Sequence, residues 1–141
     1  MAKDIYHNTV RRALEADGWT ITEDPLKLKF GEQNVYVDLG AEAPMEAERG
    51  GRKIAVEVKS FLSASPVTEI ERAVGQYVFY LPLIETQRAD TPLYLAVPAR
   101  VYASHLSSVD GRNLLSRWKI PLILYDTDTE RIVQWIEPTT P

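Results

Sequence analysis

The sequence predicts a single α/β domain in which helices pack on a mixed sheet. The first observation is the order of local patterns, which runs helix, strands, long helix, strand, helix and hairpin. The second is size, because 141 residues with 45% hydrophobic side chains are enough for one core. Since no repeat or low-complexity segment divides the chain, we expect one domain over residues 1–137 and a short tail over residues 138–141.

The N-terminal part is expected to form a helix followed by three short strands. The helix is predicted over residues 4–16, with Asp4 as its N-cap and Gly18 as its stop. Leu26, Leu28 and Phe30 alternate with lysines, which is the period of a half-exposed strand. The predicted strands cover residues 19–22, 26–30 and 34–39, with turns at Asp24-Pro25 and at residues 31–33.

The central part is predicted to contain a connection, a strand and a long helix. Residues 40–51 are rich in Ala, Glu and Gly, so we expect a connection there and a strand over residues 53–60. Pro66 suits the first position of a helix, and Pro82 is expected to end or kink that helix. The predicted apolar stripe of this helix consists of Val67, Ile70, Val74, Tyr77, Val78 and Leu81.

The C-terminal part completes the sheet. A continuous apolar run predicts a strand over residues 92–97, and residues 101–118 are expected to be helical. Two further strands, over residues 122–125 and 131–136, are separated by a polar turn and therefore predict a hairpin.

Composition excludes several classes of protein. With no cysteine, the chain cannot form disulfides, thiolate metal sites or a cysteine nucleophile. No apolar stretch approaches the roughly 20 residues that span a bilayer, so we expect no membrane contact and a cytoplasmic location. The net charge of −4 lacks the basic excess of proteins that grip nucleic acid along their length. Any contact with DNA is therefore expected to be weak or assisted by a partner.

Two predicted strands carry charged residues where apolar ones are expected. Alternation places Asp38 at the end of one strand and puts Glu57 and Lys59 on one side of another. If the two strands are neighbours, two carboxylates and an ammonium group converge. Paired carboxylates are costly to desolvate without a cation, and oxygen ligands suit Mg²⁺ or Mn²⁺. The bland alternative is a surface ion pair between Glu57 and Lys59.

The expected functional roles follow from this chemistry. Asp38 and Glu57 would bind the metal, and Lys59 would position or activate a water molecule for phosphodiester hydrolysis. In the following helix, Gln76 and Tyr80 lie four residues apart on a polar row. That row either lines the cleft and holds a phosphate backbone or is a plain solvent-facing surface.

The ordered set of Asp38, Glu57-Val-Lys59 and Gln76-Tyr-Val-Phe-Tyr80 resembles the PD-(D/E)xK nuclease superfamily. Val37 replaces the proline of the name. The resemblance implies a restriction-endonuclease-like three-layer α/β/α sandwich with a central mixed sheet. It also implies that an acidic residue of the first helix can join the site, which makes His7 or Glu15 a candidate fourth member. Glu42 is the one loop carboxylate expected to reach the site.

Nearly the whole chain also resembles the XisH family, the fdxN-element excision controlling factors of cyanobacteria. The residues that carry this resemblance are 2–7, 17–22, 24–25, 38–42, 54–61, 73–77, 93–98 and 135–136. It implies a role, with a partner excision-control protein, in the programmed excision of a DNA element. Self-association, a DNA or an RNA substrate, and a catalytically silent adaptor that binds a partner excision factor all stay open at this point.

Overall fold

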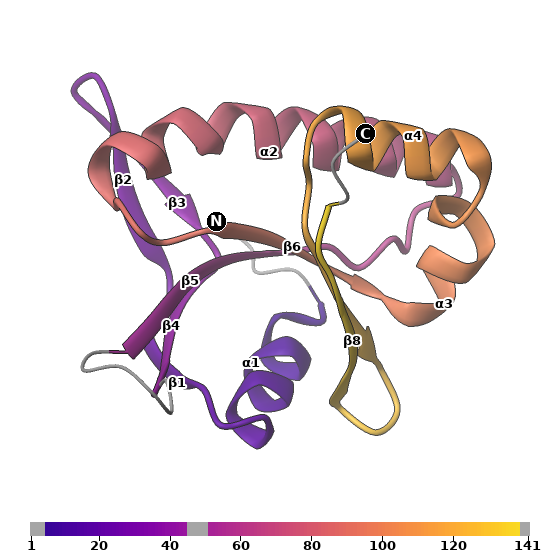
Figure 1. Cartoon of the computed structure of the whole chain (residues 1–141), viewed down its shortest axis with the longest axis horizontal. Helices are drawn as coiled ribbons and strands as arrows, with labels where there is room; N and C mark the ends of the chain where they lie inside the picture. Colours follow the sequence, from indigo (N-terminus) through magenta and orange to yellow (C-terminus); the bar gives the residue numbers. More distant parts are fainter. Residues whose placement is uncertain (1–4, 45–50, 139–141) are drawn as a thin grey trace.

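The computed structural model describes residues 5–44 and 51–138, which form a mixed α/β fold (Figure 1). Within these residues a six-stranded sheet has the order β1-β4-β5-β6-β7-β8, and β2 and β3 pair separately. The strands are β1 (Thr20–Glu23), β2 (Leu26–Phe30), β3 (Gln33–Val37), β4 (Leu39–Pro44), β5 (Gly51–Val58), β6 (Leu93–Pro98), β7 (Leu122–Asp126) and β8 (Arg131–Ile136). The helices are α1 (His7–Ala16), α2 (Pro66–Gln87), α3 (Ala99–Val101), a π-helical turn (Tyr102–Leu106) and α4 (Val109–Arg117).

The sheet is mixed and has helices on both faces. Strands β5, β6 and β7 are parallel, whereas β1, β4 and β8 join antiparallel. Helix α1 lies on one face, and α2 and α4 lie on the other (Figure 1). Strand β5 serves both cores as the sequence predicts, because Ile54, Val56 and Val58 pack on the α1 side while Ala55 packs on the α2 side.

Strands β1 to β4 form one long hairpin that bends out of the sheet. Glu23 pairs with Gly40 in the main sheet, and Leu26 pairs with Val37 in the two-stranded part. The bend therefore falls at Asp24-Pro25 on one arm and at Asp38 on the other. Beyond it, the β2–β3 hairpin rises past one end of α2 (Figure 1). This bend places the carboxylate of Asp38 between the two layers of helices.

The predicted connection over residues 40–51 is wrong in its first part, because Leu39–Pro44 is strand β4. Because its side chains are small, the sequence did not indicate this strand, which is hydrogen-bonded to β1 along one edge and to β5 along the other. A Cβ atom added to Gly40 would lie 3.0 Å from Leu26 Cδ1, so the close approach of the bent hairpin favours glycine there. Residues 45–50 of the predicted connection lie outside the described residues.

The long helix also differs from its prediction. Pro82 neither ends nor breaks α2, which continues to Gln87. Pro82 lies on the exposed side, where the carbonyl left without a donor can be hydrated. The predicted apolar stripe is right in four of its six residues, because Ile70, Val74, Tyr77 and Leu81 pack in or against the core, whereas Val67 and Val78 are 65% and 42% exposed. The buried residues of α2 are Ala73, Tyr77, Tyr80 and Ile84.

Smaller differences concern the ends of the predicted helices. Helix α1 begins at His7, and the predicted cap Asp4 lies outside the described residues. The predicted helix over residues 101–118 is interrupted, because Ser108 accepts a bond from the Gly111 amide and starts a new helix. The C-terminal hairpin is confirmed. In the described part of the chain, no helix is long and apolar enough to cross a membrane.

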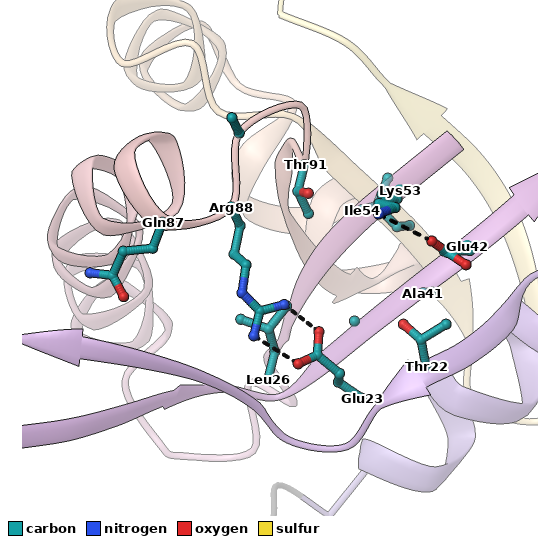
Figure 2. A pocket seen from close by; sticks show the side chains of 12 residues that line it. Thr22, Glu23, Leu26, Ala41, Glu42, Lys53, Ile54, Gln87, Arg88 and Thr91 are labelled. Atoms are coloured by element: carbon teal, nitrogen blue, oxygen red, sulfur yellow. Dashed lines mark hydrogen bonds and ion pairs between the residues drawn. The ribbon is translucent and has the colours of Figure 1, made fainter. Parts of the chain in front are cut away.

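The C-terminal end of α2 clasps the bent hairpin (Figure 2). Arg88 donates two bonds to the Glu23 carboxylate, at 2.5 and 2.8 Å, and one to the Lys27 carbonyl at 3.2 Å. Gln87 bonds both the amide and the carbonyl of Lys29, as a neighbouring strand would. A pocket of about 480 Å³ lies beside this clasp and is also lined by Lys53.

Replacing Arg88 with alanine is expected to lower the free energy of unfolding by about 1–2 kcal/mol, because a bidentate charged pair and a carbonyl contact are lost. Urea unfolding at neutral pH measures the change. Arg112→Ala removes the same charge from an exposed position on α4 and is the matched control. Equal unfolding midpoints for the two variants would show that the clasp contributes nothing.

Candidate functional site

Asp38 and Glu57 interlock at the bend of the long hairpin. Glu57 Oε1 accepts a hydrogen bond from the Asp38 amide at 3.2 Å, and Asp38 Oδ2 accepts one from the Val58 amide at 2.8 Å. Each carboxylate is thus fixed by the backbone of the other's strand. The convergence predicted from strand alternation is present, because Leu39 pairs with Val56 and the two strands are neighbours.

Lys59 joins the two carboxylates from the same strand as Glu57. Its Nζ lies 3.7 Å from Glu57 Oε2 and donates to the side-chain oxygen of Gln76 on α2. The Lys59 side chain is 16% exposed and that of Glu57 only 7%. The bland interpretation of an exposed surface ion pair is therefore wrong for this pair. Gln76 therefore contacts the site by accepting a hydrogen bond from Lys59, and this bond connects α2 to the end of β5.

Burial and the charge of Asp38 raise the pKa of Glu57 to about 8, and Lys59 opposes this rise. Desolvation is the largest cause, because the carboxyl group has little access to water. At neutral pH the Glu57 side chain is therefore mostly protonated in the metal-free protein. A cation placed between the two carboxylates would reverse both causes and favour the ionised form.

Tyr80, the second residue of α2 predicted to belong to the site, is buried. It is 9% exposed, so the predicted solvent-facing polar row does not extend to it. Burial, followed by the negative charges of Glu57 and Asp38, raises the pKa of Tyr80 to about 12. The phenol therefore stays protonated at physiological pH and remains a potential hydrogen-bond donor close to both carboxylates.

Helix α1 contributes a second set of polar groups, which links it to the bend. His7 is 2% exposed, and its Nε2 donates to Asp24 Oδ1 at 2.7 Å. Arg11 donates to the other oxygen of Asp24 at 2.6 Å. His7 Nδ1 lies 3.9 Å from Asp38 Oδ1 and has no hydrogen-bond partner among the described residues. The sequence marked Asp24 only as a turn residue, since this contact depends on tertiary packing.

The other candidate carboxylates lie elsewhere. Glu15 is half exposed and lies 4.0 Å from Arg11 on the surface of α1. Glu42 is paired with Lys53 at 3.5 Å, beside the pocket of Figure 2. It is four residues from Asp38 along β4, about 13 Å away. Of the three additional candidates, His7 alone lies next to the paired carboxylates.

Few groups in the described part of the chain are available to bind Mg²⁺. In residues 5–44 and 51–138, no three His, Asp or Glu side chains are grouped so as to hold a metal ion. The protein therefore offers two carboxylates, from Asp38 and Glu57. This set fits Mg²⁺, which usually keeps several waters and binds one or two carboxylates together with substrate phosphate. A divalent cation would also favour ionisation of the buried Glu57 carboxyl beside the partly exposed Asp38.

Comparison with known proteins identifies the family. The family model described as XisH protein matches residues 1–133. A crystal structure of an XisH family protein from Nostoc punctiforme PCC 73102 is 37% identical, with a TM-score of 0.84 over 95% of this chain and 100% of that chain. An fdxN element excision controlling factor protein from Anabaena variabilis is also 37% identical, with a TM-score of 0.84 over 96% and 100%.

No curated protein sequence matches the chain. The family match covers most of the sequence, and the structural matches cover nearly all of both chains at substantial identity. The resemblance carried by short segments of the sequence is thus confirmed at the level of the family. The chain belongs to the XisH family.

Proposed function

We propose that this XisH family protein acts in controlling the excision of a DNA element and carries a Mg²⁺-dependent nuclease site of the PD-(D/E)xK type. The relative from Anabaena variabilis is described as an fdxN element excision controlling factor, which supports the first part. The nuclease site is supported mainly by the interlocked pair of Asp38 and Glu57, with Lys59 beside it. Helices on both faces of a mixed sheet are consistent with a restriction-endonuclease-like sandwich.

Each residue has a distinct role in this proposal. Asp38 and Glu57 hold the cation, which when bound would withdraw charge from a phosphate oxygen. The Lys59 ammonium group orients the attacking water and offsets negative charge that develops at phosphorus. Gln76 keeps Lys59 directed toward Glu57 through its side-chain oxygen. Tyr80 is a neutral donor whose pKa responds to both carboxylates, and in this proposal it supports a phosphate or the metal shell.

A cleavage assay tests the proposal directly. Duplex, branched and single-stranded DNA, and an RNA of matched sequence, are incubated with the protein in Mg²⁺, Mn²⁺ or EDTA. We expect metal-dependent cleavage of at least one substrate, lost in Glu57→Gln and kept in Glu71→Gln, which alters an exposed carboxylate on α2. If no substrate is cut, alone or with a partner excision protein, the nuclease assignment is wrong.

The second candidate function is a non-catalytic adaptor for a partner excision factor. The observation in its favour is the net charge of −4, which disfavours strong independent binding to DNA. The two functions differ in a cellular excision assay. An adaptor keeps excision in the Glu57→Gln protein, whereas a nuclease loses it.

A further inference from the structure

An exposed pair of aromatic rings lies where the tip of the β2–β3 hairpin meets α2. Phe30, at the end of β2, is 55% exposed, and Phe79, on α2, is 42% exposed. Their ring centroids are 5.2 Å apart and their planes differ by 31°. We call these two residues the aromatic platform. Their exposed faces leave apolar surface that a ligand could cover.

The aromatic platform is continuous with the site through Tyr80. The Phe79 and Tyr80 rings meet edge to face, with centroids 5.6 Å apart. The Tyr80 ring is in turn close enough to Glu57 and Asp38 to feel the charges of both. A line of three aromatic rings therefore runs from the protein surface to the buried ring of Tyr80. A polymeric ligand bound at the carboxylates would be long enough to reach the aromatic platform as well.

The strand that carries Phe30 also carries two lysines. Lys27 and Lys29 are exposed on β2, and neither forms an ion pair in the part of the chain that the structure describes. Most other cations near the bend are already matched, such as Arg11 with Asp24 and Arg88 with Glu23. The unpaired positive charge of these two lysines thus lies on the β2–β3 hairpin, on the face opposite Phe30, because Lys27 and Lys29 alternate with Phe30 along β2.

We propose that the aromatic platform stacks an unpaired base of a single-stranded nucleic acid whose backbone leads into the carboxylate site. This inference rests on the proposed nuclease function and names its substrate class. Aromatic faces accept any base, and the two lysines on the other face of the same hairpin add positive charge that attracts phosphates. Bases inside a duplex are stacked on one another and cannot use the platform. The platform therefore selects single strands, or unpaired segments within a duplex.

Binding is measured by fluorescence anisotropy with a labelled 15-nucleotide oligothymidylate and with a duplex, in EDTA, so that cleavage plays no part. We expect tighter binding of the single strand. Phe30→Ala and Phe79→Ala should each weaken it about tenfold, because one stacking contact is lost. Val109→Ala and Val133→Ala remove exposed apolar groups from α4 and β8 and should leave binding unchanged. Thermal unfolding confirms that each variant is folded.

A second variant gives a direct signal of stacking. Phe30→Trp keeps an aromatic face, so it should retain wild-type affinity, and its added fluorescence should be quenched by the oligonucleotide. The inference is overturned if the wild type does not bind the single strand. It is equally overturned if both alanine variants bind like the wild type, or if they change only the sedimentation of the protein, which would indicate a protein interface.

The two proposals fail separately. Metal-dependent cleavage that is unaffected by loss of the aromatic platform would leave the nuclease function in place and remove the stacking role. Single-strand binding that depends on the platform, together with no cleavage in any metal, would keep the binding surface and remove the nuclease function.

Discussion

The Glu57→Gln protein is expected to lose metal-dependent cleavage by at least about a thousandfold and yet to be more stable than the wild type at pH 8.5. Activity falls because one of the two metal-binding carboxylates is gone. Stability rises because glutamine occupies the same buried position without a charge, and its side-chain oxygen can still accept the bond from the Asp38 amide. Opposite signs for activity and stability are characteristic of a residue kept for function.

The pH dependence follows from the raised pKa of Glu57. Its folded value is about 8, against 4.5 for the free side chain, so the folded protein holds this proton more tightly than the unfolded chain. The wild type therefore loses stability as pH rises from about 4.5 to 8, by up to about 4 kcal/mol for this group. Glutamine cannot ionise, so the difference between the two proteins grows through this window.

Thermal unfolding in EDTA at pH 5 and pH 8.5 measures the effect. At pH 8.5 the melting temperature of Glu57→Gln should exceed that of the wild type by at least about 5 °C. The exposed variant Glu71→Gln should follow the wild type at both values. Added Mn²⁺ should stabilise the wild type and not Glu57→Gln. Parallel loss of stability in wild type and Glu57→Gln between the two pH values would show that Glu57 is ionised throughout.

The part of the site built on strands is predictable from sequence. A period of two fixes which side chains share a face, so Asp38, Glu57 and Lys59 converge once their strands are neighbours. A helix is less certain, because its buried side depends on what packs against it. Tyr80 was expected on a polar row, but the β2–β3 hairpin and the sheet bury that side of α2. Gln76 remains at the edge of this contact and reaches Lys59.

The contacts that the sequence could not indicate are those made across the bend. Asp24 is 17 residues from His7 and 13 from Arg11 in the sequence. An Asp-Pro pair is typical of a turn, so nothing in the sequence indicated a further role for Asp24. The aromatic platform was missed for a similar reason, since Phe30 fits the apolar side of a half-buried strand. Phe30 remains exposed because it lies at the end of β2, where its ring meets Phe79 of α2 and is otherwise open to solvent over 55% of its surface.

Lys59→Met should reduce cleavage by about 100- to 1,000-fold while leaving the protein folded and able to bind Mn²⁺. Methionine fills a similar volume and removes the ammonium group that lies 3.7 Å from Glu57 Oε2. The lysine acts on the reacting groups and does not hold the metal, so the loss should be in kcat, with Mn²⁺ affinity changed only a few-fold. Isothermal titration of Mn²⁺ and single-turnover cleavage separate the two effects.

Gln76 provides the control that identifies how Lys59 works. Its side-chain oxygen accepts from the Lys59 ammonium group, so Gln76→Ala should lower cleavage about tenfold in the wild type and have no effect in Lys59→Met. Additive losses would mean that Gln76 binds the substrate directly, as the sequence suggested. Near-normal cleavage by Lys59→Met, with Glu57→Gln inactive, would mean that the two carboxylates suffice for the reaction and that the lysine serves to lower the pKa of Glu57.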